Sequence, residues 1–190
     1  MMTKADIRKL MRQRKADCPQ QRRAALSLEA ILCVEASAQW QRAQTVLLYH
    51  SLPDEVDTHD LIRRTAASGK QVLLPVVDGD DLQLRRYYPS ATLSEGAFHI
   101  LEPTGPAFTD TDAVGYALIP GIAFTPDGWR LGRGRGYYDR LLPRLSNAYK
   151  VGICWPFQLL PQLPSEPHDV RMDDIACANI ADKPIPSTTP

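Results

Sequence analysis

Two patterns of hydrophobic residues alternate along the chain: short continuous apolar runs, and longer stretches with helical spacing. Continuous runs are typical of strands that are buried on both faces of a sheet. Such strands are expected at residues 45–49, 71–76, 117–121 and 150–154, with a last short one at 174–178. Helices are expected from Thr3 to just before Pro19 and over residues 20–40, 58–69 and 136–146.

Two segments depart from this alternation. The turn signal Asp78-Gly79-Asp80 and the alternating residues 82–85 predict a return strand antiparallel to the one before it. Residues 89–113 are rich in Pro, Thr, Gly and Ala, and we expect them to be irregular.

The N-terminal helix carries two stripes. Thr3 and Asp6 have the spacing of a capping box. An apolar stripe consists of Ile7, Leu10 and Met11, and a basic stripe beside it consists of Lys4, Arg8, Arg12 and Lys15. One face is therefore suited to packing and the other to binding an anion.

Strands that alternate with helices predict an α/β fold. We expect a single domain over residues 1–182, with an open, mainly parallel twisted sheet flanked by helices and an N-terminal helical segment, and a flexible tail at 183–190. Ligands of such sheets bind beyond the carboxyl ends of the strands. The loops at 50–58, 121–139 and 155–173 are the candidates for that position.

The composition excludes several classes of protein. The 190 residues are 44% hydrophobic and 23% charged, which argues against a disordered chain, a collagen or a coiled coil. Lys and Arg number 22, as do Asp and Glu, so a general nucleic-acid coat protein is disfavoured. Any bound anion must be held by a local cluster of cations.

The chain also gives expectations about its compartment. It begins with a charged segment and has no run of 18 apolar residues, so we expect neither a signal peptide nor a membrane span, and a cytoplasmic location. Four cysteines at irregular spacing, without a CxxC pair, are expected to be small core residues in a reducing compartment: Cys18, Cys33, Cys154 and Cys177.

The segment of residues 130–139, RLGRGRGYYD, carries the strongest chemical signal. Its glycines allow a close approach of the backbone to a ligand, and its arginines provide bidentate donors suited to phosphate oxygens. The loop is expected to open a helix, whose N-terminus would add to the anion site. The two tyrosines flank a flat heterocycle or pack under the loop, and Asp139 is placed to hold Mg²⁺.

Other interpretations of this segment remain open. A glycine-rich turn before a helix is often only a turn, and the spacing fits neither a Walker loop nor the Rossmann fingerprint. RNA binding is a further alternative, because Arg-Gly repeats occur in RNA-binding segments, although those usually lie in basic, low-complexity sequence.

Two other loops carry candidate polar groups. Asp54, Glu55 and Asp57 follow the first buried strand, and they are either turn and capping acids or a grip for the amino or amide groups of a substrate. In the third loop, His168 and Asp169 are adjacent, and Asp169 is a second candidate carboxylate for the metal.

The chain resembles the 5-formyltetrahydrofolate cyclo-ligases, also called methenyltetrahydrofolate synthetases. The resemblance lies in residues 118–124 (LIPGIAF) followed by 130–139, and in the order of Lys4 and Arg8, the loop at 54–58, Leu163-Pro164 and His168-Asp169. It spans nearly the whole chain. Family loops often have an aromatic residue, lysine or glycine where Arg133 and Arg135 stand here.

The resemblance implies a set of site residues. ATP would contact Lys4, Arg8, Arg130, Leu131, Gly132, Arg133, Gly134, Arg135, Gly136, Tyr137 and Tyr138. The reduced folate would contact Leu52, Glu55, Asp57 and residues 133–137, among them Arg133, Gly134, Arg135, Gly136 and Tyr137. Arg133, Arg135 and Tyr138 would be catalytic, and Asp139 and Asp169 would hold Mg²⁺.

The implied reaction converts ATP and 5-formyltetrahydrofolate into 5,10-methenyltetrahydrofolate, ADP and phosphate. It needs no protein nucleophile, which agrees with the absence of a nucleophile motif from the sequence. The implied partners are ATP and a reduced folate, without nucleic acid or membrane, and a monomer is expected. The alternatives are another ATP-dependent enzyme on the same scaffold and a non-catalytic RNA-binding module.

Overall fold

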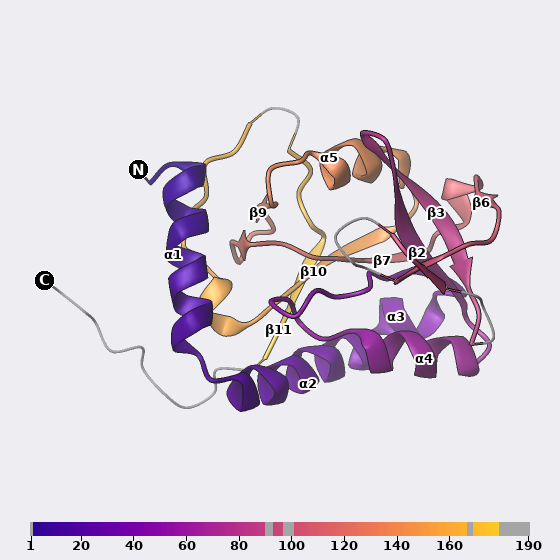
Figure 1. The fold of residues 1–190 in the computed structure, drawn as a ribbon, viewed down its shortest axis with the longest axis horizontal. Helices are drawn as coiled ribbons and strands as arrows, with labels where there is room; N and C mark the ends of the chain where they lie inside the picture. Colours follow the sequence, from indigo (N-terminus) through magenta and orange to yellow (C-terminus); the bar gives the residue numbers. More distant parts are fainter. Residues whose placement is uncertain (1, 90–92, 97–100, 167–168, 179–190) are drawn as a thin grey trace, which may run out of the picture.

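A seven-stranded sheet runs through the centre of the computed structural model, which describes residues 2–89, 93–96, 101–166 and 169–178 (Figure 1). Its order is β11 (Asp174–Cys177), β10 (Tyr149–Cys154), β7 (Tyr116–Ile119), β1 (Thr45–Leu47), β2 (Gln71–Asp78), β3 (Asp81–Tyr87) and β6 (Ala107–Phe108). The first five strands are parallel, and β3 and β6 are antiparallel to their neighbours. The predicted mainly parallel α/β sheet and its antiparallel return strand are confirmed.

Helices cover both faces of this sheet, with α2 (Gln20–Ala36), α3 (Ala38–Arg42) and α4 (His59–Ala67) on one face and α5 (Tyr137–Leu141) on the other (Figure 1). Successive residues of a strand point to opposite faces. In β1, Val46 faces the helices α2 to α4 while Leu47 joins the core on the α5 side. Burial on both faces explains why these strands are continuous apolar runs.

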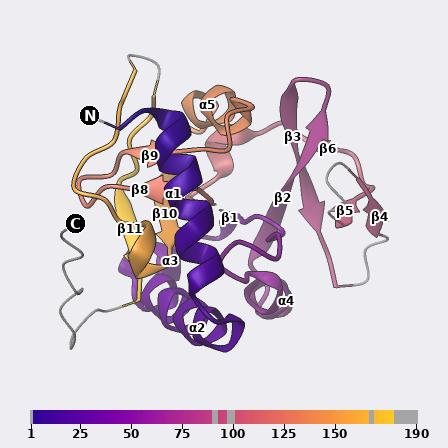
Figure 2. The same ribbon diagram turned by 60° about the vertical axis from the view of Figure 1, so that its left-hand side comes forward.

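The N-terminal helix α1 (Lys4–Asp17) lies at one end of the molecule, on the left in Figure 1 and brought to the front in Figure 2. Thr3 and Asp6 form the predicted capping box. The apolar stripe of α1 packs on a hairpin of β8 (Ala123–Phe124) and β9 (Arg130–Leu131), where Ile7 and Met11 contact a cluster that includes Leu131. The segment of residues 130–139 therefore begins directly against α1.

Several expectations about local structure were wrong in detail. The helix expected over 20–40 breaks at Ser37, which has an extended backbone and accepts a hydrogen bond from Trp40 N with its Oγ at 3.2 Å. Residues 89–113, expected to be irregular, include the short strands β4 (Leu93–Glu95), β5 (Leu101–Pro103) and β6 and a 3₁₀ turn at Thr111–Ala113. The β8–β9 hairpin was not predicted.

Some expectations lie partly or wholly outside the described residues, namely the tail at 183–190, the domain end at 182 and the position of His168. Among the described residues all four cysteines are free thiols, and Cys154 is buried as expected while the other three are half-buried. No helix in the described ranges combines the length and the apolar character needed to cross a membrane.

The order of the strands fixes where a ligand can bind. The chain passes from β1 to β2 on one side and later returns to β7 on the other side of β1. Strand order thus reverses at β1, and a crevice opens beyond the carboxyl ends of β1 and β7 at such a point. The loops that follow these two strands carry the acidic residues 54–57 and the glycine loop 132–136.

Candidate active site

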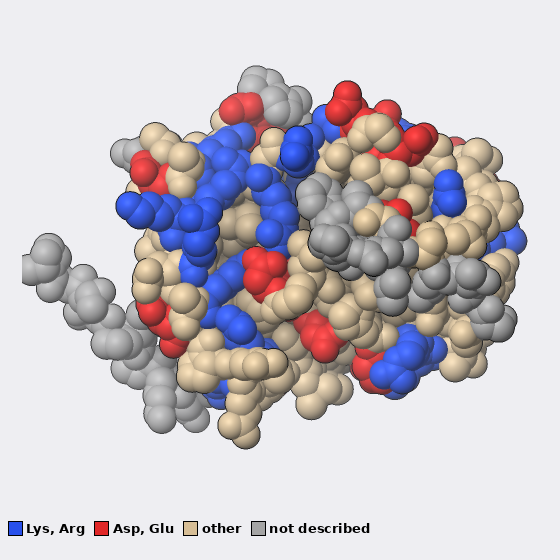
Figure 3. All heavy atoms as spheres, in the orientation of Figure 1, with Lys and Arg blue, Asp and Glu red and all other residues tan. Residues whose placement is uncertain are grey.

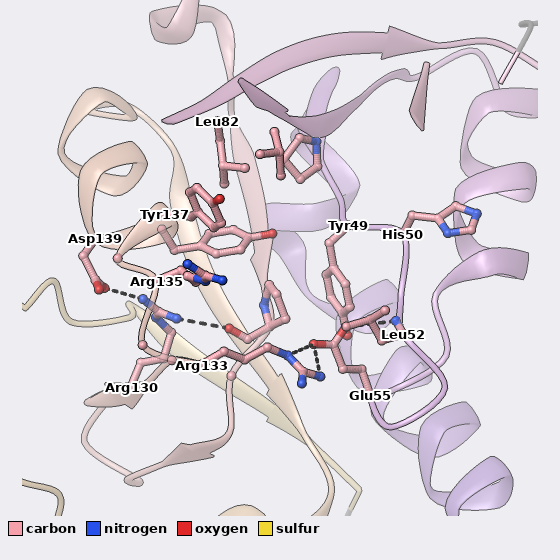
Figure 4. A pocket seen from close by; sticks show the side chains of 18 of the residues that line it. Tyr49, His50, Leu52, Glu55, Leu82, Arg130, Arg133, Arg135, Tyr137 and Asp139 are labelled. Atoms are coloured by element: carbon pink, nitrogen blue, oxygen red, sulfur yellow. Dashed lines mark hydrogen bonds and ion pairs between the residues drawn. The ribbon is translucent and has the colours of Figure 1, made fainter. Parts of the chain in front are cut away.

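A cavity of about 380 Å³, here called the central cavity, opens beyond the carboxyl ends of β1, β2 and β7 (Figure 4). The glycine loop and the start of α5 form one wall, and side chains from β2, β3 and β5 form the opposite wall. Its lining residues are Tyr49, His50, Leu52, Glu55, Pro75, Val77, Leu82, Glu102, Pro120, Gly121, Arg130, Gly132, Arg133, Gly134, Arg135, Gly136, Tyr137, Tyr138 and Asp139.

Two residues of the glycine loop have a backbone conformation that residues other than glycine adopt only with strain. Gly134 and Gly136 have φ values of +102° and +71°, in the left-handed region. A Cβ on Gly134 would lie 3.2 Å from the Arg8 guanidinium, and the carbonyl of Gly132 accepts a hydrogen bond from Arg8 Nε at 3.1 Å. The glycine loop therefore packs closely against Arg8 of α1.

Arg130 is held in the base of the cavity by a buried ion pair. Its side chain is only 4% exposed, and its guanidinium donates to Asp139 Oδ1 at 2.5 Å and lies 5.5 Å from the centre of the Tyr138 ring (Figure 4). Burial lowers the pKa of Arg130, and the Asp139 carboxylate opposes that effect. Burial likewise raises the pKa of the Tyr138 hydroxyl, which keeps it protonated.

Arg133 reaches across the cavity from the glycine loop to the loop that carries Asp54 and Glu55, here called the acidic loop (Figure 4). It donates to Asp54 Oδ1 at 2.6 Å and to Glu55 Oε1 at 2.9 Å, and Lys15 also contacts Asp54, at 3.0 Å. Burial acts to raise the pKa of Asp54, but hydrogen bonds from Arg133 and Lys15 outweigh it and the pKa lies below its ordinary value. These ion pairs hold the two loops together.

Arg135 differs from its neighbouring arginines. Its side chain lies beside Tyr137 at the cavity (Figure 4), and no acidic group among the described residues pairs with it. A cation that has no internal partner is available to a bound anion.

A second hollow, here called the basic groove, lies between α1 and the same two loops. It has a volume of about 320 Å³ and is lined by Arg8, Met11, Arg12, Lys15, Asp54, Ile122 and Arg133. Lys and Arg side chains gather over this part of the surface (Figure 3). Arg133 lines both the basic groove and the central cavity, so the two hollows are neighbours.

The two carboxylates expected to hold a metal both interact electrostatically with Arg130. Asp139 pairs with Arg130, and Asp169 accepts from Lys4 Nζ at 3.4 Å and from the backbone N–H of Glu166 at 2.7 Å. Both carboxylates oppose the lowering of the pKa of Arg130 by burial. The described residues contain no group of three His, Cys, Asp or Glu side chains that could enclose a metal on their own.

Two expected site residues and one expected helix differ from the sequence-based prediction. Asp57 does not line the central cavity, and its Oδ1 accepts from the backbone N–H of His59 at 3.0 Å and pairs with His59 Nδ1 at 3.2 Å. Leu131 packs under α1 rather than lining the cavity. The helix opened by the glycine loop has five residues, which is too short for its N-terminus to act as an anion site, and the arginines carry the charge instead.

The wall opposite the glycine loop was missed by sequence reasoning. It consists of Pro75, Val77, Leu82 and Glu102, from β2, β3 and β5. The turn signal at 78–80 predicted that β2 and β3 pair, but it carried no indication that this hairpin faces the glycine loop. The third candidate loop, 155–173, contributes to the surroundings of Lys4 through Asp169 rather than to the cavity.

Comparison with known proteins assigns the chain to a family. The model of the 5-formyltetrahydrofolate cyclo-ligase family matches residues 1–178. The chain belongs to the 5-formyltetrahydrofolate cyclo-ligase family. The resemblance inferred from the glycine loop is confirmed by a match that covers all of the described elements.

Individual relatives agree with this assignment. The chain is 27% identical over 186 residues to the 5-formyltetrahydrofolate cyclo-ligase of Mus musculus, covering 90% of this chain and 92% of the relative. It is 34% identical over 142 residues to the cyclo-ligase of Mycolicibacterium smegmatis, covering 70% and 72%. The NMR structure of Aquifex aeolicus 5,10-methenyltetrahydrofolate synthetase superposes with a TM-score of 0.82, at 31% identity over 97% of this chain and 96% of that one. The chain is therefore an enzyme of this family, which disfavours the RNA-binding alternative.

Proposed function

We propose that the protein converts 5-formyltetrahydrofolate and ATP into 5,10-methenyltetrahydrofolate, ADP and phosphate. The observation that carries the proposal is the adjacency of two unlike hollows, a cavity with one apolar wall and a basic groove, with Arg133 lining both. A flat ring with polar edges suits the first hollow and a polyphosphate suits the second. The names of the relatives support the same reaction.

In this proposal the folate lies in the central cavity, against Leu52, Glu55 and Tyr137. The phosphates of ATP lie at the glycine loop and the adjoining face of α1, near Arg8. The contact of Arg8 with Gly132 and Gly134 supports this placement, because it holds a guanidinium group at the glycine loop. Arg135, which has no acidic partner among the described residues, would meet the transferred phosphoryl group.

The proposed chemistry activates a formyl group that resonance makes a poor electrophile. The formyl oxygen attacks the γ-phosphorus of ATP, the bond to the bridging oxygen breaks, and ADP leaves. The N10 lone pair then attacks the formyl carbon, the carbon–oxygen bond breaks with release of phosphate, and N10 loses its proton. The protein contributes position and positive charge, from Arg133, Arg135 and the buried Arg130, and Tyr138 supports the loop from beneath.

The described residues fit a Mg²⁺ ion that is shared with the nucleotide. Mg²⁺ usually takes one or two protein carboxylates and completes its shell with phosphate oxygens and water. Asp139 and Asp169 are two carboxylates near the same arginine, and they would hold such an ion. When bound, the ion would neutralise negative charge on the phosphates.

A direct assay tests the proposal. The purified chain is mixed with ATP, Mg²⁺ and 5-formyltetrahydrofolate, and the near-ultraviolet band of the more conjugated product is followed against a reaction without ATP. We expect the band to grow only in the complete mixture, with one phosphate released per product. No product in the complete mixture would overturn the proposal, and ATP hydrolysis dependent on another amide or acid would favour the alternative enzyme.

A further inference from the structure

Glu102 is a buried acidic side chain that the mechanism above does not use. It lies in β5, is 8% exposed, and lines the central cavity on the wall opposite the glycine loop. Its Oε1 accepts from the backbone N–H of Val77 at 3.3 Å. Val77 pairs with Leu82 in the hairpin of β2 and β3, so the carboxylate sits at the apolar end of the cavity.

The other carboxylates of the cavity have cationic partners. Glu55 pairs with Arg133, and Asp139 pairs with Arg130. Among the residues that the structure describes, Glu102 has no such cation, and one long hydrogen bond leaves most of its acceptor capacity unused. A buried carboxylate is costly unless hydrogen-bond donors surround it.

The backbone around Glu102 is shaped to keep the carboxylate in place. A Cβ on Gly96, in the segment that follows β4, would collide with Glu102 Oε2. The paired strands β4 and β5 bring Gly96 and Glu102 together. The carboxylate is therefore confined between Val77 N and Gly96, with the cavity on its remaining side.

We infer that Glu102 is the residue that recognises the aminopyrimidine edge of the folate ring. This edge presents an amino group and a neighbouring ring N–H side by side, which match the two oxygens of a carboxylate. Asp57, one of the two acids that the family resemblance suggested for the folate, is engaged by His59 and does not line the cavity. The inference rests on the proposed function, since it assigns an orientation to the same substrate.

This orientation agrees with the distribution of charge in the cavity. The arginines of the glycine loop lie on one side and Glu102 lies on the other, with the apolar residues Val77 and Leu82 beside it. With its aminopyrimidine edge at Glu102, the ring lies along the apolar wall. Its other end, which carries the formyl group, then points toward the arginines where the phosphoryl group would arrive.

The test uses two ligands and two proteins. Binding of 5-formyltetrahydrofolate, and of its analogue with a methyl group in place of the 2-amino group, is measured by calorimetry for the wild type and Glu102→Gln. We expect Glu102→Gln to lower the affinity for 5-formyltetrahydrofolate by about 10- to 100-fold. The variant loses a charged hydrogen-bond acceptor, and its amide N–H₂ faces a donor group of the ring. The analogue keeps the ring N–H, so we expect Glu102→Gln to weaken its binding by a clearly smaller factor, and a non-hydrolysable ATP analogue should bind both proteins equally.

The two possible roles of Glu102 predict different results. If Glu102 has a purely structural role, Glu102→Gln lowers the affinity for both folates by the same factor, and this result would overturn the inference. The wild type alone gives a second test in case the variant does not fold, because equal affinity for the two folates would also overturn it. A wild type that neither binds nor converts 5-formyltetrahydrofolate would instead overturn the proposed function, and this inference with it.

Discussion

The two walls of the central cavity differ in their chemistry and in how the chain forms them. The glycine-loop wall comes from one continuous segment, residues 130–139. Two of its arginines, Arg130 and Arg133, are held in ion pairs, and Arg135 has no acidic partner among the described residues. The opposite wall comes from three separate strands and contributes Pro75, Val77, Leu82 and the carboxylate of Glu102. The first wall is suited to stabilising charge that develops in the reaction, and the second to holding and orienting a ring.

The comparison predicts that changes on the charged wall affect turnover, whereas changes on the apolar wall affect folate binding. The largest effect is expected for Arg135→Ala. Arg135 has no internal acidic partner among the described residues, so its charge is free for the transferred phosphoryl group. We expect kcat/KM to fall about 100-fold or more, as for other donors to transition-state charge, with little change in melting temperature.

The matched control for this change is Arg144→Ala, an exposed arginine that does not line the cavity. It should retain nearly full activity. Similar losses in both variants would show that overall charge, rather than the position of Arg135, supports the reaction.

The next effect concerns the backbone of the charged wall. In Gly134→Ala the new Cβ lies 3.2 Å from the Arg8 guanidinium at a φ of +102°. We expect roughly tenfold weaker binding of a non-hydrolysable ATP analogue, and a stability cost of about 1 to 3 kcal/mol from the backbone strain. Calorimetric titration beside a thermal melt measures both.

Gly69→Ala provides the control for backbone strain. Gly69 has a φ of +91° and no atom within 4 Å of its Cβ position, and it lies at the end of α4, away from both hollows. It should lose stability but keep its affinity for the nucleotide. If Gly134→Ala also loses stability but keeps its affinity for the nucleotide, the glycine loop is a structural turn and does not bind phosphate.

The contrast between the walls also explains what the sequence could predict. Residues 130–139 are consecutive, so their glycines and arginines display the chemistry before any fold is known. The buried strands could also be predicted from the sequence, because burial on both faces makes them continuously apolar. Val77, Leu82 and Glu102 lie in different strands, and only the pairing of β2 with β3 and the packing of β5 bring them together.

Asp57 shows a different limit of sequence reasoning. Capping and ligand binding both favour an acid at such a position, and the sequence left the two interpretations open. The contact with the backbone N–H of His59 is a local one, made two residues along the chain. Which acid of this loop reaches the cavity depends on the path of the backbone, and the structure places Glu55 there.

A smaller effect is expected on the apolar wall. Leu82→Ala removes side-chain surface from the cavity, and we expect about tenfold higher KM for the folate with an unchanged KM for ATP. Leu84→Ala is the control, since Leu84 is buried in the same strand but does not line the cavity. Both variants should lose about 2 to 5 kcal/mol of stability. An equal rise of both KM values in Leu82→Ala would contradict the separation of the two walls.

The smallest effect tests whether ion pairs hold the charged wall in place. The pKa of Asp54 is lowered by Arg133 and Lys15 despite its partial burial, so its charged form stabilises the folded state. That contribution is fully present above the pKa of the unfolded chain, about 3.9, and is lost as the pH falls through the lower pKa of the folded state. Because the side chain is 47% exposed, we expect the contribution to be no more than about 1 kcal/mol. Denaturant unfolding of the wild type and Asp54→Asn at several pH values measures it: the difference should be largest near neutrality, shrink toward pH 3 and weaken in high salt. A difference in stability that stays constant across this pH range would mean that Asp54 acts through packing rather than charge. Packing would then hold the charged wall in place, as it holds the apolar wall.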